Sequence, residues 1–181
     1  MNPIRFDLGD GLIVRTFVPD EDAELFGLIE ANRDRLRPWM LWEPATKAPG
    51  DVRDFIERSL ASPESLDANG IWVDGELAGS IGFGVDPPAN SAEIGYWLSA
   101  AFEGRGIVTR ACARLFDFAF DELGLHRMEL CAAVGNDRSR AVARRLGMTE
   151  EGIARDGERV HGGYLDLVTY GILEDEWRAR R

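Results

Sequence analysis

Cysteine and histidine are scarce in this sequence. Among 181 residues there are two cysteines, Cys112 and Cys131, and two histidines, His126 and His161. Neither cysteine has the spacing of a zinc or redox motif, and two isolated histidines are too few for a zinc site. Neither cysteine has a paired histidine that would activate it as a nucleophile. We therefore expect two free, buried thiols and no metal.

Long apolar runs and a basic charge balance are also missing. No stretch approaches the roughly 20 apolar residues that cross a bilayer, and the first ten residues lack the pattern of a signal peptide. The 21 Lys and Arg against 32 Asp and Glu give a net charge of −11, whereas nucleic-acid binding normally requires a basic face. We expect a cytoplasmic protein without membrane or nucleic-acid partners. Its acidic surface either steers a cationic substrate or only confers solubility.

The apolar pattern that is present changes its period along the chain. Helical spacing gives way after residue 61 to β-branched and aromatic runs separated by turns such as Asp74-Gly75, and then to alternating helices and strands. The expected helices are 20–32, 51–61, 104–123, 137–146 and a short one around Trp177; the expected strands are 12–18, 71–73, 77–85, 92–98, 127–134, 152–155 and 164–172. Hairpins followed by helix crossovers predict an α+β fold with a mixed sheet. We expect one domain over residues 1–181.

A glycine-containing turn, Glu103-Gly104-Arg105-Gly106, joins a predicted strand to a predicted helix. Such a turn directs free backbone N–H groups and the helix dipole towards one point, where a pyrophosphate would be stabilised. The signal is weak alone, because many strand-to-helix turns carry glycine for steric reasons. It is neither a Walker loop, since no Gly-Lys-Ser/Thr follows, nor a Rossmann fingerprint, since the preceding strands pair as hairpins.

Several motifs in order give a more specific signal. Residues 93–98 (Glu-Ile-Gly-Tyr-Trp-Leu) followed by 103–109 (Glu-Gly-Arg-Gly-Ile-Val-Thr) resemble the acetyl-CoA site of the GNAT superfamily. Residues 136–139 (Asn-Asp-Arg-Ser), 145–148 (Arg-Leu-Gly-Met) and 36–39 (Leu-Arg-Pro-Trp) with Trp42 resemble its RimJ/RimL-like branch, which acetylates the N-termini of ribosomal proteins. The resemblance implies the GNAT fold: a mostly antiparallel sheet of about seven strands, splayed between two parallel strands and flanked by helices. A homodimer is also implied.

The resemblance assigns acetyl-CoA as cosubstrate, with no metal. Pantetheine would bind backbone groups at Trp97, Leu98 and Ser99. The remaining cofactor-binding residues implied are Gly104, Arg105, Gly106, Ile107, Val108, Thr109, Asn136 and Ser139. Glu103 departs from the family, where the loop usually begins with Gln or Arg, and Val108 stands where a small residue or Met is usual.

Acyl transfer to an amine needs a proton acceptor and a group that stabilises the leaving thiolate. Glu93 is the candidate base, against the alternative of an ordinary polar strand residue. Asp166, Glu129 and Glu103 compete for this role. Ala143 stands where many superfamily members carry a tyrosine acid, so the resemblance implies Ser139 as the group at the sulfur. The local alternative is that Asn136 and Asp137 cap the following helix, with Ser139 in its first turn.

The acceptor site is the least defined part. Trp39, Trp42 and Tyr96 could line it, although aromatic residues are more often part of a core. Arg33, Arg35 and Arg37 could make it locally basic. The leading hypothesis is acetylation of a protein or peptide N-terminal α-amine by direct transfer in a ternary complex. The alternatives are acetylation of a small amine, such as an antibiotic or polyamine, and a CoA-binding module without catalysis.

Overall fold

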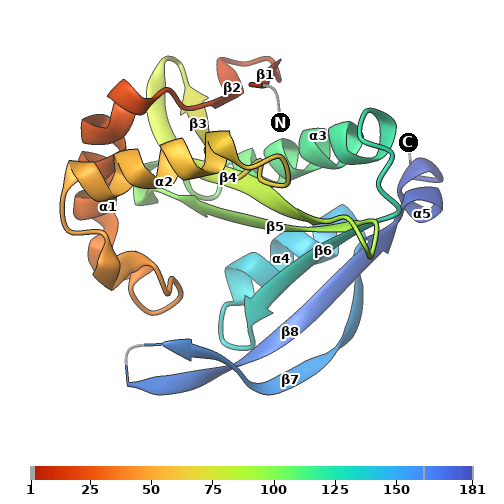
Figure 1. Ribbon diagram of the computed structural model, residues 1–181. Coiled ribbons are helices and arrows are strands. Elements are labelled where there is room, and N and C mark those ends of the chain that lie inside the picture. The colour runs from red at the N-terminus through yellow and green to blue at the C-terminus, as the bar shows by residue number, and fades with distance from the viewer. Residues whose placement is uncertain (1–2, 161, 181) are drawn as a thin grey trace.

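The computed structural model describes residues 3–160 and 162–180 and contains an eight-stranded sheet flanked by helices (Figure 1). The spatial order of the strands is β1-β2-β3-β4-β5-β6-β8-β7, and every neighbouring pair is antiparallel except β5–β6. The strands are β1 (Arg5–Asp7), β2 (Leu12–Thr16), β3 (Asn69–Val73), β4 (Glu76–Asp86), β5 (Ser91–Leu98), β6 (Arg127–Ala133), β7 (Thr149–Val160) and β8 (Gly163–Leu173).

Two pairs of helices cover the two faces of the sheet. The helices are α1 (Asp22–Leu36), α2 (Pro49–Ala61), α3 (Ile107–Asp121), α4 (Asp137–Leu146) and the short α5 (Glu174–Arg178). The first pair packs Leu25, Ile29 and Ile56 onto Trp72 and Trp97 of the sheet. The second pair packs a larger core onto the other face, including residues of α3, α4, β5 and β6. Burying one apolar face of each helix is what holds such a layered fold together.

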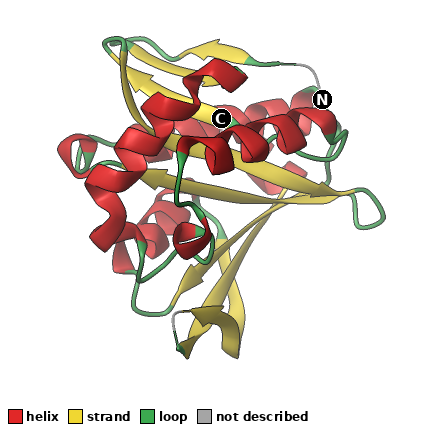
Figure 2. Ribbon diagram, turned by 60° about the vertical axis from the view of Figure 1, so that its left-hand side comes forward, coloured by secondary structure: helices red, strands yellow, loops and turns green. Residues whose placement is uncertain are grey.

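The α+β prediction is confirmed, and the main differences concern β1, α1 and β7. Strand β1 was not predicted and raises the count from about seven to eight. Helix α1 runs to Leu36 rather than to Asn32. Asn32 is accommodated inside the helix because its amide donates to Leu28 O and accepts from Ala100 N. Strand β7 is much longer than the predicted 152–155, and with β8 it forms a hairpin that extends away from the helices (Figure 2).

The parallel pair β5–β6 separates along its length. Residues Ser91, Ala92 and Glu93 pair with Arg127, Met128 and Glu129, and the ladder stops there. Beyond this point β5 continues along β4 and β6 continues along β8, so the two strands diverge (Figure 1). The middle of the sheet is therefore open between residues 94–98 of β5 and residues 130–133 of β6.

Among the described residues, no helix is both long and apolar enough to cross a membrane.

Candidate functional site

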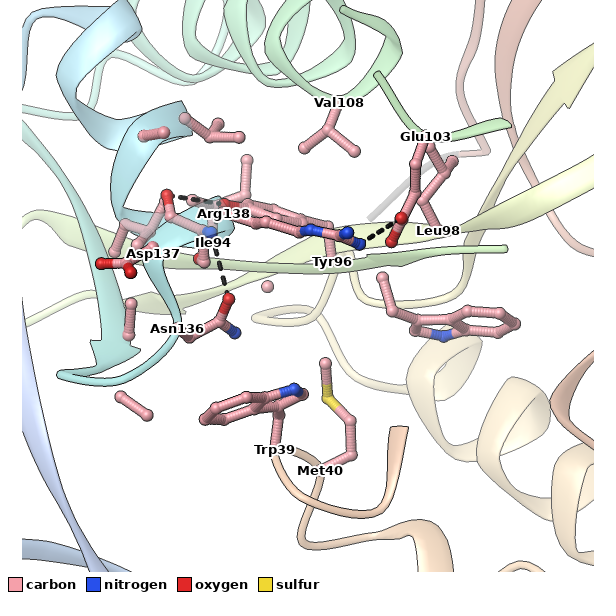
Figure 3. Close-up of a pocket in the computed structure, with 18 of the residues that line it drawn as sticks. Trp39, Met40, Ile94, Tyr96, Leu98, Glu103, Val108, Asn136, Asp137 and Arg138 are labelled. Carbon is pink, nitrogen blue, oxygen red and sulfur yellow. Dashed lines mark hydrogen bonds and ion pairs between the residues drawn. The ribbon is translucent and has the colours of Figure 1, made fainter. Parts of the chain in front are cut away.

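A cavity of about 1400 Å³ fills the opening between β5 and β6. Its walls come from the divergent parts of both strands, the segment after α1, the loop before α3, and the start of α4 (Figure 3). Pockets for one small ligand are usually about 300–1,000 Å³. This cavity is larger, so it has room for two ligands that meet.

The glycine loop forms one wall of the cavity and is shaped for an anion. Gly104 and Gly106 have φ of +74° and +73°, a left-handed conformation that favours glycine. An ideal Cβ on either residue would meet nothing within 4 Å, so the backbone here faces open space rather than protein. Within the described part of the chain, the N–H groups of residues 104–109 have no protein acceptor. Six free N–H groups at the start of α3 fit the pyrophosphate of acetyl-CoA.

A hydroxyl pair lies on the same side of the sheet as this loop. The hydroxyls of Tyr96 and Ser139 are 2.9 Å apart, and Ser139 N donates to Asn136 Oδ1 at 3.2 Å (Figure 3). Asn136 is therefore the N-cap of α4, as the local alternative predicted, and it lines the cavity as well. Burial raises the pKa of the Tyr96 phenol above its ordinary value, so the phenol remains a protonated donor.

Glu93 lies at the point where β5 and β6 separate, and its side chain is accessible from the cavity. Partial burial raises its pKa, the negative charges of Glu129 and Glu158 raise it further, and a hydrogen bond with the Cys131 thiol opposes the rise. A carboxylate with a raised pKa is a better proton acceptor near neutral pH. These properties make Glu93 a candidate for a general base.

The competing carboxylates are engaged elsewhere. Glu129 accepts from Arg127 Nε at 2.6 Å, and Asp166 accepts from the Asp156 N–H at 2.8 Å. Glu103 is held by two arginines. Glu93 remains the best-placed candidate base.

The candidate groups are divided between the two faces of the sheet. Side chains alternate along a strand, so Glu93 shares the α1–α2 face with Trp97, whereas Tyr96 shares the α3–α4 face with Ile94 and Leu98. Trp39 lines the cavity from the segment that follows α1 (Figure 3). One ligand can thus enter along the glycine loop and the other past Trp39, and they meet in the gap between the strands.

Most of the sequence-predicted residues line this one cavity. They are Trp39, Glu93, Tyr96, Trp97, Leu98, Gly104, Gly106, Ile107, Val108, Thr109, Asn136 and Ser139.

Three predicted residues are not brought to the cavity. Ser99 is buried, its N–H donates to Ala78 O at 2.8 Å, and its carbonyl accepts from the Phe102 N–H at 3.0 Å. Both of its backbone groups are therefore used within the protein. Arg105 is exposed, with its guanidinium 5.6 Å from the centre of the Phe102 ring. Trp42 packs against Trp97, with ring centroids 6.4 Å apart.

The predicted basic patch is largely neutralised. Arg33 binds Glu30 and Glu43, and Arg35 binds Glu103. Only Arg37 of the three is exposed without such a contact among the described residues. The acceptor side of the cavity instead carries the carboxylates Glu93 and Glu158.

Cys131, Glu158 and Arg138 are among the lining residues that the sequence analysis did not assign to the site. Cys131 was expected to be buried but is half-buried and lines the cavity, while Cys112 is buried as expected. Burial and the nearby Glu93 charge raise the pKa of the Cys131 thiol, which disfavours the thiolate. Glu158 reaches the cavity from β7 after an irregular stretch of its ladder with β8, and Arg138 reaches it from the first turn of α4.

The described residues contain no group of three or more His, Cys, Asp or Glu that could hold a metal ion, and His161 lies outside them.

Comparison with known proteins gives a consistent picture. Residues 11–149 match the family described as "Acetyltransferase (GNAT) domain". YdaF of Bacillus subtilis (strain 168), named provisionally as a ribosomal N-acetyltransferase, is 39% identical over 96% of this chain and 97% of its own length. The ribosomal-protein-serine acetyltransferase of Escherichia coli (strain K12) is 29% identical over 83% of this chain and 86% of its own.

One solved structure is informative about the coenzyme. The microcin C7 self immunity acetyltransferase MccE, in complex with acetyl-CoA and AMP, superimposes with a TM-score of 0.85 at 29% identity. The match covers 92% of this chain and 94% of MccE.

Proposed function

The chain belongs to the GNAT acetyltransferase family, and from this premise we propose that it transfers an acetyl group from acetyl-CoA to the N-terminal α-amine of a protein or peptide. The transfer is direct, within a ternary complex. The observation that carries the proposal is a shared cavity, which has the free N–H groups of the glycine loop on one side of the sheet gap and the Glu93 carboxylate on the other. The ribosomal names of two relatives favour a ribosomal protein as the acceptor.

The chain binds and orients the two reactants. Acetyl-CoA, when bound, provides an acyl group already activated as a thioester. The N–H groups of residues 104–109 hold the phosphates, and the unpaired edge of β5 after Glu93 aligns the pantetheine. The cavity walls orient the two reactants, which converts a bimolecular encounter into a reaction within one complex.

Glu93 accepts the proton of the amine, and the hydroxyls of Tyr96 and Ser139 stabilise the negative charge on the leaving sulfur. The amine nitrogen forms the new C–N bond as the C–S bond breaks, and its proton passes to Glu93 directly or through water. The electron pair leaves on sulfur, on the face where Tyr96 and Ser139 present hydroxyl donors. Two hydrogen-bonded hydroxyls replace the tyrosine acid that is absent at Ala143, and the raised pKa of Tyr96 keeps its proton available for donation.

The charge of the acceptor side agrees with an amine substrate. An α-amine is partly protonated near neutral pH, so Glu93 and Glu158 attract it into the cavity. The ammonium proton is lost to solvent before the attack, and Glu93 then takes the second proton as the C–N bond forms. The same carboxylates would attract a small polycation, so the experiment has to separate the two acceptor classes.

Thiol release from acetyl-CoA across a matched set of amines tests the proposal. The set holds a peptide with a free N-terminus and an internal lysine, the same peptide N-terminally formylated, spermidine and an aminoglycoside. We expect turnover with the free peptide, with the acetyl group on its first residue by mass spectrometry, and little turnover with the formylated form. Transfer only to lysine or to the small amines would contradict the proposal.

Two variants connect this activity to the cavity. Ser139→Ala and Tyr96→Phe are expected to lower kcat by about 10- to 100-fold, because each removes one hydroxyl from the leaving-group side. Thr149→Ala, an exposed hydroxyl removal on β7, serves as the control and keeps full activity. Binding of acetyl-CoA without turnover on any amine would favour the non-catalytic alternative.

A further inference from the structure

Glu103 connects two arginines that come from different walls of the cavity. One of its carboxylate oxygens accepts from Arg35 in the last turn of α1, and the other accepts from Arg138 in the first turn of α4. All three side chains line the cavity, and Figure 3 shows Arg138 reaching Glu103 across it. The carboxylate therefore pairs with both cations and offsets one of their two positive charges.

This contact lies beside the free N–H groups of the glycine loop. Glu103 immediately precedes Gly104, where the run of unpartnered N–H groups begins. An anion held by these N–H groups would be close to the Glu103 carboxylate and would be repelled by it. The same anion would be attracted by Arg35 and Arg138, whose guanidinium groups match phosphate oxygens.

We propose that Glu103 competes with the phosphates of the coenzyme for Arg35 and Arg138, so that coenzyme binding transfers both guanidinium groups from the carboxylate to phosphate. The inference rests on the proposed function, since it requires CoA to bind along the glycine loop. It assigns Arg35 and Arg138 as phosphate-binding residues and Glu103 as a side chain that weakens coenzyme binding.

Moving the two guanidinium groups from Glu103 to phosphate should cost little free energy. The Arg138 side chain is 74% exposed, and ion pairs at such exposed positions contribute little stability. Breaking them on coenzyme binding therefore costs little. The protein carries a net charge of −11, while Glu103, Arg35 and Arg138 together carry a formal +1. Removal of the Glu103 charge leaves two uncompensated cations facing the coenzyme.

Isothermal titration with CoA alone, at low and at moderate ionic strength, tests the inference without any acceptor. Glu103→Gln is expected to bind CoA about three- to tenfold more tightly than the wild type, with a steeper loss of affinity as salt rises. Arg138→Gln and Arg35→Gln are expected to bind it about three- to tenfold more weakly. In Glu103→Gln/Arg138→Gln most of the gain disappears, because one of the two released cations is missing.

Matched controls separate this local effect from net charge. Glu76→Gln, at the exposed first residue of β4, and Arg144→Gln, on the exposed side of α4, make the same charge changes away from the cavity. Both should leave CoA affinity within about twofold of the wild type. Unchanged or weaker binding by Glu103→Gln would overturn the inference, as would an equal gain in Glu76→Gln. Failure of the wild type itself to bind CoA would instead overturn the proposed function.

Discussion

Strands β5 and β6 are hydrogen-bonded at one end, where residues 91–93 pair with residues 127–129, and they separate at the other. We call these the joined end and the open end. The joined end places Met128 in a fully buried core and pairs Arg127 with Glu129 and Glu151 on the surface. The open end, from Ile94 and Leu130 onward, faces a cavity lined by hydroxyls, a carboxylate and free N–H groups. A sheet that gives up ladder hydrogen bonds in its middle leaves polar backbone groups that need a partner. The joined end thus belongs to the core and the surface, whereas the open end is the part to which the proposed function assigns binding and chemistry.

The largest effect is expected at the junction of the two ends. Glu93→Gln keeps the size of the side chain but removes the base, so kcat/KM should fall by about 10²–10⁴-fold, measured by thiol release with a free peptide. CoA affinity should be nearly unchanged, because Glu93 faces the α1–α2 side. An active Glu93→Gln variant would show that another group takes the proton.

The same substitution has a predictable sign for stability. Burial and two like charges raise the pKa of Glu93, so the folded protein holds this proton more tightly than the unfolded chain does. The charged form therefore destabilises the fold as pH rises through the unfolded and then the folded pKa. Glu93→Gln should not lower the free energy of unfolding at neutral pH, and a clear loss in denaturant titration would argue against this environment.

The joined end should dominate stability. Met128→Ala removes a side chain with 0% exposure and should lower the free energy of unfolding by about 2–5 kcal/mol. Leu167→Ala, a half-buried cavity residue on β8, should cost about 1 kcal/mol. Urea denaturation measures both, and similar losses at the two positions would remove the distinction between the ends.

The glycine loop allows a smaller, paired test. Gly106→Ala forces a side chain into a left-handed conformation, so it should lower the free energy of unfolding by about 1–2 kcal/mol and also weaken CoA binding. Gly84→Ala is the control, since its φ is not positive and an added Cβ meets nothing within 4 Å. Equal behaviour of the two variants in thermal melts and CoA titration would mean that the loop conformation does not matter.

The smallest effect concerns pH. Glu158 is one of the charges that raise the pKa of Glu93. Glu158→Gln should therefore lower this pKa and move the acid limb of the rate profile to lower pH by less than about one unit. The control Glu76→Gln should leave the limb in place. A shift to higher pH would contradict the like-charge effect.

Much of this fold could be predicted because its core elements have regular apolar patterns. The four strands from β3 to β6 and helices α3 and α4 were expected near their observed bounds. Strand β7 was underestimated because its residues Thr149–Val160 are mostly exposed and polar, so no alternation marks them. Strand β1 is a three-residue edge strand whose pairing with β2 decides its conformation. Such elements depend on tertiary contacts rather than local pattern.

The sequence predicted the parts of the site that depend on backbone conformation. It did not predict the ion pairs and hydrogen bonds made by long side chains. Glycine is the residue type that most readily takes the positive φ found at Gly104 and Gly106, and the loop lies in the cavity as expected. The direction of an arginine does not follow in this way. Arg110 follows the glycine loop but donates to Leu8 O at 2.6 Å, while Arg138 reaches Glu103. These contacts join residues 102 and 35 positions apart in sequence, which no local pattern encodes.

The central claim is that CoA occupies the open end of the β5–β6 pair and leaves the joined end untouched. Amide hydrogen exchange with and without CoA measures this residue by residue. The account predicts slower exchange for residues 104–109 and along β5 after Glu93, with no change at residues 91–93 and 127–129. Protection confined to other parts of the chain, or none at the glycine loop under saturating CoA, would contradict it.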